Sequence, residues 1–575
     1  MKTSDFVAHF LERQRVPCVF ELVGGMITHL LDSLDRRGRV RSVSMHHEQA
    51  AAFAADAMGR ILGTPGVAMA TSGPGATNLV TGIASCYFDS SPAVFLTGQV
   101  NRGEQKGSRG VRQLGFQETD IVSIAAPVTK AAWQAQRPED VPRLLRESFR
   151  LAVSGRPGPV LLDLPMDVQR EEVPDSPDDA GANISSQDAN DAAPMAQELL
   201  DALARAERPL IVAGGGLRAA RCRELFRTLA SKLQVPVVHS LRGVDALPYG
   251  HPMRVGMIGT YGNRWANLAL GRADFLLVLG SRLDVRQTGS DTTAFRGEKA
   301  VFHVDADPAE INNRVTGCRA VVCRLQDFLP SFLRACEARP PVTRLPWREE
   351  IATLRAMWPD TAEQAQCPGI HPNLFMHELS QLANRAAAFV VDVGQHQMWA
   401  AQSLELGPDQ LFLTSGGMGS MGFALPASIG AAFALRDRPI VAIAGDGGFQ
   451  CNLQELETVV RNGLPLKIVV VNNRCLGMVR QFQQSYFEDR YCSTLWGYSA
   501  PDFARVAAAY GIASETVEDA GAVRPALTRM WRDPSAPSLL QVMVNPMVNA
   551  YPKVRFGRPV TDMEPQAAPR TTEEM

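Results

Sequence analysis

The sequence predicts an α/β protein with three domains, each built on a doubly wound parallel sheet. Short apolar runs of strand length, such as PIVAIAG from Pro439 to Gly445, alternate with segments of helical periodicity. The run GVAMATSGPGATNLVTGIASCYFDSSPAVFLTG contains strand, glycine turn, helix and strand in that order. The chain has 575 residues, too many for one hydrophobic core and a suitable length for about three domains of ~190 residues.

Two proline-containing breaks divide the chain. Residues 171–194, EEVPDSPDDAGANISSQDANDAAP, have no aromatic side chain and are rich in Asp, Ser, Pro and Ala, which predicts a surface linker. Residues 338–347, ARPPVTRLPW, precede an amphipathic helical stretch that extends to about residue 365. We therefore predict domains over residues 1–172, 193–337 and 368–550, followed by a C-terminal tail over residues 551–575.

The composition is that of an ordinary globular protein. With 45% hydrophobic residues, 21% charged residues and a formal net charge of -2, the chain has no excess of positive charge to attract nucleic acid or anionic lipid. Its ten cysteines form no CxxC motif and no Cys/His cluster of metal-ligand spacing, which argues against a disulfide framework and a structural zinc site. No signal peptide or membrane-spanning run is visible, so we expect a cytoplasmic protein.

An aspartate and an amide pair follow two predicted strands near the C-terminal end. Asp446 comes directly after PIVAIAG, and Asn472 and Asn473 come directly after LKIVVV. Between the strands we predict a DGG turn and a helix that ends at Gly463 and Pro465. The residues expected on one apolar face of this helix are Leu453, Leu456, Val459 and Val460.

The predicted chemistry of this sheet edge is a metal-bridged phosphate. The carboxyl ends of parallel strands form the ligand-binding edge of an open α/β sheet, and carboxylate and amide oxygens are ligands that Mg²⁺ or Ca²⁺ prefers. Glycines beside Asp446 allow the backbone to approach a phosphate closely at a helix N-terminus. On local evidence alone, Asp446 could equally cap the helix and the asparagines could form a turn. The glycines concerned are Gly445, Gly447 and Gly448.

The GDG and NN motifs, at the interval that separates Asp446 from Asn473, resemble the signature of thiamine diphosphate (ThDP) enzymes. The resemblance implies that Asp446, Asn473 and the backbone carbonyl of Cys475 bind Mg²⁺ against the cofactor diphosphate. It also implies a glutamate, from a separate domain, beside the pyrimidine ring. Glu48 in SMHHEQAAAFAADAMGR is the candidate, because it follows the strand-like RVRSVS and opens an alanine-rich helix. Alone, such a glutamate would simply stabilise a helix N-terminus.

Two further segments match the cofactor contacts of these enzymes. In SGGMGSMGFALPASIGA, Met421 aligns with the apolar residue that lies between the two cofactor rings, and Gly419 would offer a backbone carbonyl to the amino group. In DVGQHQMWAAQ, the residues expected at the diphosphate are Gly394, Gln395 and His396. Glu48, in a poorly solvated site, would share a proton with a pyrimidine nitrogen and so activate the cofactor.

The chain from about Phe20 to Phe503 resembles the catalytic subunit of acetohydroxyacid (acetolactate) synthases. The matching segments are TSGPGATNLVTGIA, GFQETDIV, SGRPGPVLLDLPMDV, HVDADPAEIN, DVGQHQMWAAQ and LGMVRQFQ. The resemblance implies that pyruvate is decarboxylated and its acetyl unit transferred to a second carbonyl. It also implies a FAD of structural role in the middle domain, although AGGG lacks the GxGxxG spacing and alone would be a strand-to-helix turn. The expected FAD residues are Arg156, Gly214, Gly215, Gly216, Arg282, Asp284, Arg286 and Asp305.

The acceptor side of the site carries the departures from the synthase pattern. Phe482 stands where synthases that prefer a larger 2-oxo acid have tryptophan, LVGG replaces YPGG, Val285 replaces an acidic residue, and the usual C-terminal tail is missing. Lys130 and Arg286 match cations near the FAD and the acceptor carboxylate, a group that suits arginine, but either could form a surface ion pair. Other residues matched to the catalytic centre and substrate pocket are Phe116, Gln117, Gly24, Gly25 and Met478.

Three functions are therefore considered. The first is a ThDP-, Mg²⁺- and FAD-dependent carboligase that forms acetolactate from pyruvate. The second keeps donor and cofactors but transfers acetyl to an aldehyde, ketone, diketone or keto sugar in secondary or surface-polysaccharide metabolism. The third is a non-catalytic nucleotide-binding relative, against which the presence of Glu48, Asp446 and Asn473 argues. The resemblance also places active sites between subunits of a homodimer or homotetramer; the sequence carries no signal for or against a regulatory subunit.

Overall fold

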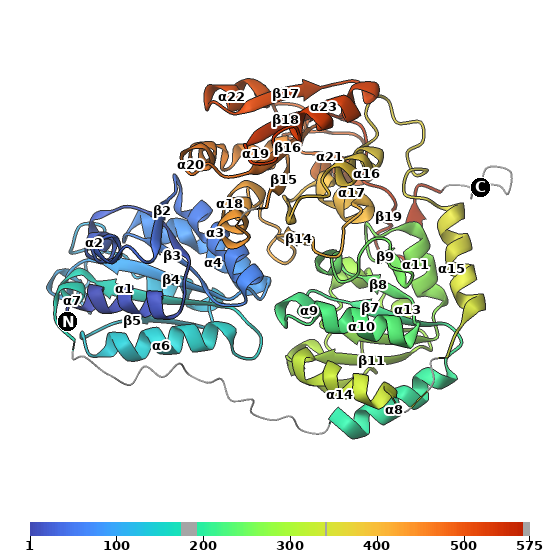
Figure 1. Cartoon of the computed structure of the whole chain (residues 1–575), viewed down its shortest axis with the longest axis horizontal. Helices are drawn as coiled ribbons and strands as arrows, with labels where there is room; N and C mark the ends of the chain where they lie inside the picture. The colour runs from blue at the N-terminus through green and yellow to red at the C-terminus, as the bar shows by residue number, and fades with distance from the viewer. Residues whose placement is uncertain (174–191, 338, 340–341, 437, 567–575) are drawn as a thin grey trace.

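The computed structural model describes residues 1–173, 192–337, 339, 342–436 and 438–566 (Figure 1). Within these residues the chain forms three six-stranded sheets whose strands all run parallel, with helices packed on the sheet faces. The predicted α/β class with three doubly wound sheets is therefore confirmed. Most of the predicted linker at residues 171–194 and part of the second break lie outside the described residues, so the domain boundaries stay predictions.

The N-terminal domain lies on the left in Figure 1. Its strand order is β2-β1-β3-β4-β6-β5. The strands are β1 (Cys18–Leu22), β2 (Arg41–Ser44), β3 (Gly66–Ala70), β4 (Ala93–Gln99), β5 (Ala131–Gln134) and β6 (Pro159–Pro165). The helices are α1 (Thr3–Arg13), α2 (Thr28–Arg37), α3 (Glu48–Leu62), α4 (Pro74–Phe88), α5 (Ile121–Ala125), α6 (Asp140–Val153) and α7 (Met166–Arg170).

The central domain lies below and to the right in Figure 1, with strand order β12-β11-β10-β7-β8-β9. The strands are β7 (Pro209–Ala213), β8 (Val237–His239), β9 (Arg254–Met257), β10 (Phe275–Leu279), β11 (Ala300–Asp305) and β12 (Arg319–Val322). The helices are α8 (Ala192–Arg205), α9 (Gly216–Ala219), α10 (Arg223–Leu233), α11 (Arg264–Arg272), α12 (Val285–Thr288), α13 (Thr292–Arg296) and α14 (Leu325–Glu337). Helix α15 (Leu345–Met357) then leads to the third domain, as the second predicted break indicated.

The C-terminal domain lies above the other two, with strand order β14-β13-β15-β16-β18-β17. The strands are β13 (Ala388–Val391), β14 (Leu411–Thr414), β15 (Ile440–Gly445), β16 (Leu466–Asn472), β17 (Ala513–Val517) and β18 (Ser538–Met543). The helices are α16 (Pro372–Leu382), α17 (Gln395–Ser403), α18 (Ala424–Ala434), α19 (Asp446–Gln450), α20 (Leu456–Arg461), α21 (Gly477–Tyr486), α22 (Phe503–Ala509) and α23 (Val523–Met530). Strands β13, β15 and β16 are buried on both faces, as expected for a covered parallel sheet.

The segment between β15 and β16 differs in detail from the sequence prediction. The DGG motif begins the short helix α19 instead of forming a turn, because Asp446 already lies in the first helical turn. Leu453 belongs to a 3-10 turn before α20, and Val460 is 37% exposed. Since Val460 lies about 100° around the helix from buried Val459, it falls at the edge of the apolar face. The strand ends at Asp446 and Asn473 are as predicted.

Helices α3 and α18 join the N-terminal and C-terminal domains. A Cβ atom at Gly430 would lie 2.0 Å from the backbone oxygen of Ala54, so only glycine permits this helix spacing. The rings of Phe53 and Phe423 meet edge to face with centroids 5.4 Å apart. The junction fixes the start of α3, where Glu48 lies, relative to the segment that precedes α18.

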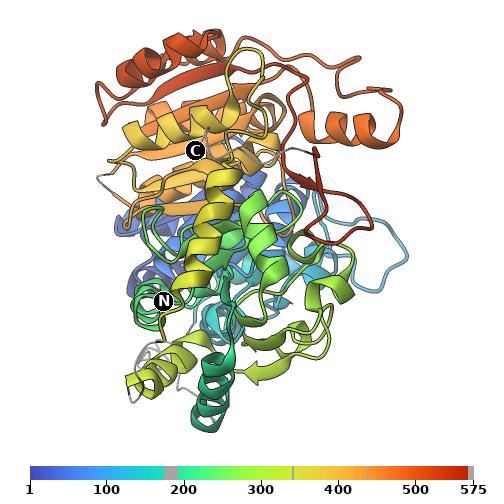
Figure 2. The ribbon, with the colours of Figure 1, turned by 90° about the vertical axis from the view of Figure 1, so that its right-hand side faces the viewer.

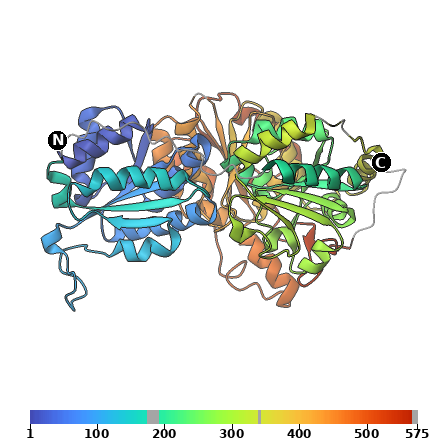
Figure 3. The ribbon, with the colours of Figure 1, turned by 90° about the horizontal axis from the view of Figure 1, so that it is seen from below.

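The N-terminal and central domains lie side by side when the molecule is viewed from below (Figure 3). Figure 2 shows two segments that project from the same side of the molecule, the light-blue loop between β4 and α5 and the orange helix α21. Both expose apolar side chains, with Phe116 80% exposed on the loop and Phe482 49% exposed on the helix.

The described part of the predicted tail packs on the central domain. Strands β19 (Lys553–Val554) and β20 (Met563–Glu564) pair antiparallel, and the backbone N–H of Val554 donates to the carbonyl of Thr260 at 2.8 Å. Residues 567–575 of the predicted tail lie outside the described residues. In the described ranges, no helix has the length and apolar character needed to cross a membrane.

Candidate active site

The carboxyl ends of β13, β15 and β16 surround a cavity of about 100 Å³ that we call the aspartate cavity. Its lining combines segments that the sequence analysis had singled out separately. The predicted residues found together there are Gly394, Gln395, His396, Met421, Gly445, Asp446, Gly447, Gly448, Asn473, Cys475 and Met478. The predicted site at this sheet edge therefore corresponds to a real cavity.

Asp446 is nearly fully buried, with 2% of its surface exposed. Its Oδ2 accepts a hydrogen bond from the hydroxyl of Tyr498 at 3.1 Å. Burial raises the pKa of the Asp446 carboxyl to about 6, because neutral hydroxyl and backbone N–H donors only partly replace the lost hydration. A bound cation would favour the ionised carboxylate in this environment.

The amides of Asn473 and Gln395 orient each other. Asn473 Nδ2 donates to Gln395 Oε1 at 3.1 Å, while Asn473 Oδ1 accepts from the backbone N–H of Cys475 at 3.2 Å. Gln395 Nε2 in turn donates to Gln481 Oε1 and to the carbonyl of Val548, both at 3.1 Å. Because the amide nitrogen of Asn473 is committed to Gln395, its oxygen is the atom left to face a cation.

His396 contributes an unused nitrogen to the aspartate cavity. The ring is buried, and its Nε2 has no hydrogen-bond partner among the described residues. Burial lowers the pKa of His396 to about 3, so the imidazole is neutral. A Cβ atom at Gly445 would lie 2.9 Å from Nδ1 of this ring, so glycine leaves the room that the imidazole occupies. A buried polar atom without a protein partner in a cavity calls for a water molecule, an ion or a ligand.

The loop that carries Met421 is held by Asp392, a residue that the sequence analysis did not single out. Asp392 Oδ1 accepts from the backbone N–H of Gly422 at 3.0 Å, and Oδ2 accepts from that of Ala424 at 2.8 Å. Met421 is 39% exposed and borders the aspartate cavity. Gly419 has φ +69° in the same loop but does not line the cavity.

Glu48 begins α3, as predicted, and is 6% exposed. Its Oε2 accepts a hydrogen bond from Nδ2 of Asn78 at 2.9 Å. The neighbouring Gln49 reaches the C-terminal domain, because its Oε1 accepts from Asn452 Nδ2 at 3.2 Å. Glu48 itself does not line the aspartate cavity of the same chain.

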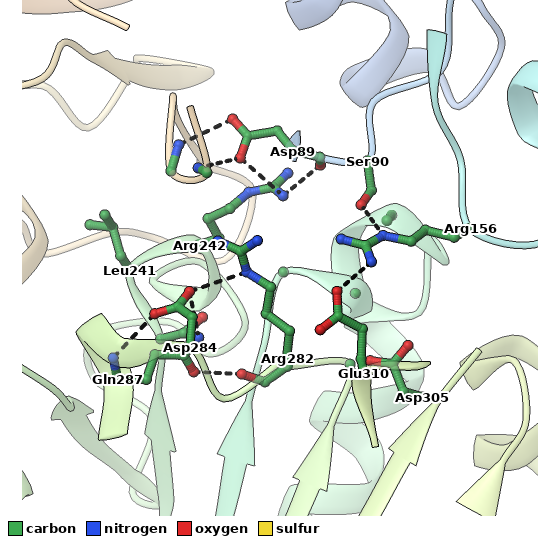
Figure 4. A pocket seen from close by; sticks show the side chains of 18 of the residues that line it. Asp89, Ser90, Arg156, Leu241, Arg242, Arg282, Asp284, Gln287, Asp305 and Glu310 are labelled. Atoms are coloured by element: carbon green, nitrogen blue, oxygen red, sulfur yellow. Dashed lines mark hydrogen bonds and ion pairs between the residues drawn. The ribbon is translucent and has the colours of Figure 1, made fainter. Parts of the chain in front are cut away.

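A second cavity of about 210 Å³, which we call the interdomain cavity, has residues of all three domains in its wall (Figure 4). Gly214 does not line it: a Cβ atom there would lie 2.0 Å from the carbonyl oxygen of Gly280, so this glycine permits backbone packing. The other residues predicted for FAD do line it, namely Arg156, Gly215, Gly216, Arg282, Asp284, Arg286 and Asp305.

Several charged side chains around the interdomain cavity form ion pairs. Arg156 donates to Ser90 Oγ at 2.8 Å and forms ion pairs with Glu310 at 2.5 Å and Asp307 at 3.1 Å. Asp284 caps α12 by accepting from the backbone N–H of Arg286 at 2.9 Å, and its other oxygen pairs with Arg282 at 3.2 Å (Figure 4). The cavity therefore offers both hydrogen-bond donors and acceptors to a large polar ligand.

The residues predicted for the acceptor side are spread over several places. Lys130 lines neither cavity, and its ammonium donates to the carbonyls of Leu151 at 2.6 Å, Ser154 at 2.5 Å and Arg156 at 2.9 Å, which completes the C-terminal end of α6. Burial lowers the pKa of Lys130 to about 8. Gln117 has a left-handed backbone with φ +66°, and Gly25 begins a 3-10 turn after Gly24.

Models of known protein families match all three domains. The N-terminal TPP (thiamine pyrophosphate) binding domain of thiamine pyrophosphate enzymes matches residues 1–124, their central domain matches residues 196–332, and their C-terminal TPP binding domain matches residues 392–542. Thiamine pyrophosphate is another name for ThDP. The chain belongs to the thiamine pyrophosphate enzymes.

Among curated relatives of this family, the chain is similar to several acetolactate synthase large subunits. It is 39% identical to that of Parasynechococcus marenigrum, over 95% of this chain and 88% of the relative. It is 37% identical to the isozyme 2 large subunit of Escherichia coli, over 98% and 99%, and 35% identical to the large subunit of Lactococcus lactis, over 96% and 94%. The predicted resemblance to acetolactate synthases is thereby confirmed.

The aspartate cavity suits the diphosphate end of the thiamine cofactor. The neutral ring of His396 has an unpartnered Nε2 which, in the tautomer that carries its hydrogen there, can donate to an anionic oxygen. A Cβ atom at Gly447 would lie 2.6 Å from Cδ2 of Leu476 and 3.2 Å from Cε of Met421, so the backbone here comes closer to these side chains than a residue with a Cβ atom would permit. Buried Asp446 offers a carboxylate oxygen of the kind that divalent cations prefer.

Proposed function

We propose that this chain is the catalytic subunit of a ThDP-dependent carboligase that decarboxylates pyruvate and transfers its acetyl unit to a second carbonyl, giving acetolactate when the acceptor is pyruvate. The observation that carries the proposal is the buried cavity in which Asp446, Asn473 and an unpartnered His396 meet. The names of the acetolactate synthase relatives, matched over nearly the whole chain, support the choice of donor and product.

ThDP, when bound, supplies the nucleophilic carbon and accepts the electrons released by decarboxylation. The chain's own residues would bind and orient it. Asp446 through its carboxylate, Asn473 through its side-chain oxygen and Cys475 through its backbone carbonyl would hold Mg²⁺ against the diphosphate. Met421 would lie between the cofactor rings, and Glu48 would hold the proton at the pyrimidine nitrogen.

The active site would lie between two copies of the chain. Glu48 does not line the aspartate cavity of its own chain, and Phe116 on the same domain is 80% exposed. A second copy that placed its N-terminal domain over the aspartate cavity would bring Glu48 to the cofactor and cover the exposed Met421. A homodimer is therefore the minimal active form, and a tetramer of two such dimers is compatible with it.

The interdomain cavity is proposed to hold FAD as a structural cofactor. Its volume is about 210 Å³, compared with about 100 Å³ for the aspartate cavity. Its arginines and carboxylates suit a ligand with both phosphates and hydroxyl groups. Acetyl transfer involves no net oxidation or reduction, so the flavin need not exchange electrons. Arg286, which lines this cavity, would meet the acceptor carboxylate. Met478, which lines the aspartate cavity, and Phe482 would shape the acceptor pocket.

Transfer to a carbonyl other than a 2-oxo acid is a second candidate, favoured by the nature of residue 482. A phenylalanine at this position is smaller than the tryptophan of synthases that prefer a larger 2-oxo acid, and Phe482 packs against Tyr486 with ring centroids 4.7 Å apart. The smaller ring would leave more room for a different carbonyl acceptor.

Product analysis separates the two candidates. Purified protein is incubated with ThDP, Mg²⁺, FAD and pyruvate, with and without a panel of aldehydes, ketones, diketones and keto sugars. Acetolactate as the fast and dominant product supports the first candidate. Slow turnover of pyruvate alone, accelerated by one ketone or keto sugar that appears acetylated in the product, supports the second. Absence of CO₂ release under every condition contradicts both.

A further inference from the structure

Asp89 lies at the point where the three domains meet, in the wall of the interdomain cavity (Figure 4). It directly follows α4, and its side chain is fully buried. Its Oδ1 accepts from the backbone N–H of Gly417 at 2.7 Å, and its Oδ2 accepts from that of Gly416 at 3.1 Å. A carboxylate of the N-terminal domain thus holds a loop of the C-terminal domain by two charge-assisted hydrogen bonds.

Two buried arginines neutralise Asp89. Arg60, from α3, donates to Oδ2 at 3.0 Å, and Arg242, from the central domain, lies 3.4 Å from Oδ1 and also donates to the backbone oxygen of Asp89. Burial alone would raise the pKa of Asp89, but Arg242, Arg60 and the two glycine N–H groups outweigh it and hold the pKa below its usual range. The carboxylate is therefore ionised and bound from all three domains.

The loop that Asp89 holds borders both cavities. Gly416 and Gly417 line the interdomain cavity, whereas Met421, a few residues later, lines the aspartate cavity. Arg60 fixes the two ends of the same loop, because its Nη1 donates to the carbonyl of Thr414 at 2.7 Å and its guanidinium stacks on the ring of Phe423 at 5.3 Å. A shift of Asp89 or of its arginines would displace the loop at its start and at its end.

We propose that Asp89 is a positioning residue that couples ligand binding in the interdomain cavity to ThDP binding in the aspartate cavity. The inference rests on the proposed function. Arg242 is the link, since it lines the interdomain cavity and contacts Asp89 at the same time. A ligand that orders Arg242 orders Asp89, the glycine pair and hence Met421. By thermodynamic linkage, FAD then tightens ThDP binding by the same factor by which ThDP tightens FAD binding.

The test is a binding measurement that needs no turnover. ThDP is titrated calorimetrically into cofactor-stripped protein at fixed Mg²⁺, once without FAD and once at saturating FAD. For the wild type, FAD lowers the Kd of ThDP by about tenfold, within the usual range of coupling between two sites. For Asp89→Asn, which removes the charge and one acceptor, the ratio of the two Kd values falls to within about twofold of one.

Asp163→Asn is the matched control. Asp163 is also fully buried, but among the described residues its carboxylate accepts from side chains of its own domain alone, Thr97, Gln99 and Gln134. This variant keeps the wild-type ratio of the two Kd values.

Gly417→Ala is the second test variant and leaves every charge in place. Its Cβ atom would lie 2.8 Å from the backbone oxygen of Phe88, which pushes the loop away from Asp89. The ratio falls towards one in this variant as well.

The outcomes separate the inference from the proposed function. A wild-type ratio near one, retention of the tenfold ratio in Asp89→Asn, or equal loss in Asp163→Asn overturns the coupling through Asp89 while leaving ThDP binding intact. If Asp89→Asn does not fold, Gly417→Ala decides, and a wild-type ratio in that variant overturns the inference. Failure of the wild type to bind ThDP with or without FAD contradicts the proposed function, and the inference with it.

Discussion

The hydroxyl of Tyr498 donates a hydrogen bond to Oδ2 of Asp446 at 3.1 Å. Tyr498 lies on the segment between α21 and α22, so this segment reaches back over the start of α19. The bond orients the carboxylate that we propose as a cation ligand. Residues that orient a metal ligand in this way commonly determine how tightly the metal binds.

Tyr498→Phe is expected to raise the Mg²⁺ concentration needed for half-maximal ThDP binding by about tenfold, the lower end of the effect seen when a partner of a metal ligand is removed. The measurement is a Mg²⁺ titration of ThDP binding by calorimetry. Tyr491→Phe is the control, because its hydroxyl donates to Asp489 on the same segment at 2.6 Å. An unchanged Mg²⁺ requirement in Tyr498→Phe would show that Asp446 is not a metal ligand held by this tyrosine.

Gly477→Ala is expected to weaken ThDP binding by about tenfold or more without unfolding the protein, because it disturbs the amides beside the proposed metal. Gly477 begins α21, and a Cβ atom there would lie 2.0 Å from Gln395 Oε1 and 2.6 Å from Asn473 Nδ2. The two amides would have to separate. Gly250→Ala, where a Cβ atom meets nothing within 4 Å, is the control. Wild-type ThDP affinity in Gly477→Ala would mean that the amide pair does not form part of the site.

Glu48→Gln is expected to bind ThDP normally but to lose CO₂ release from pyruvate by about 10²- to 10⁴-fold, the usual contribution of a positioned acid or base. The amide keeps the size of the side chain and an oxygen for Asn78 but cannot hold the transferred proton. Rates are measured with ThDP and Mg²⁺ at saturation. A fully active variant would remove Glu48 from the mechanism.

Mixing two inactive variants tests whether the site is shared between chains. Asp446→Ala should abolish ThDP binding, because the cavity loses its only proposed carboxylate ligand. If sites form between subunits, a heterodimer of Glu48→Gln and Asp446→Ala contains one site with both residues intact. Part of the wild-type activity should then return after the two variants are dissociated and reassembled together. No recovery, despite demonstrated exchange of subunits, would place the complete site within one chain.

The stability conferred by His377 should decrease as the pH rises. Its Nε2 lies 2.9 Å from Asp360 Oδ2 and its Nδ1 lies 2.8 Å from Glu405 Oε1. Burial alone would lower the pKa of His377, but the two carboxylates outweigh burial and raise it. A raised pKa means that the stabilisation is complete below the ordinary histidine value of about 6.5 and is lost as the pH passes the raised value.

Denaturant unfolding of the wild type and His377→Asn checks this sign. The difference in free energy of unfolding should be larger at pH 6 than at pH 9. His9→Asn, at a ring that is one-third exposed, serves as a surface control. A difference that grows with pH would mean that the neutral imidazole is the stabilising form.

The sequence was sufficient for features that depend on local pattern. The strand ends at Asp446 and Asn473 follow from apolar runs and glycines, and the family motifs added Glu48, His396 and Met421. Asp446, Asn473 and His396 meet around one cavity because the strand ends of a parallel sheet share an edge.

Contacts between distant segments could not be predicted in the same way. Asp89 and Gly417 meet because the three domains pack together. Tyr498 and Asp446 meet because the segment between α21 and α22 folds back over the start of α19. The resemblance placed Lys130 among the cations near the FAD and the acceptor carboxylate, but its ammonium donates to backbone carbonyls near the end of α6. A periodic pattern predicts which face of a helix or strand is apolar. It does not predict which polar side chain lies opposite a given residue.

The most direct test of the proposed function is release of CO₂ from pyruvate by protein stripped of cofactors and then supplied with ThDP and Mg²⁺ separately and together. The proposal predicts release only when both are present in the wild type, and none in Asp446→Ala. Release that does not depend on ThDP, or its absence with both cofactors restored and ThDP bound, would contradict it.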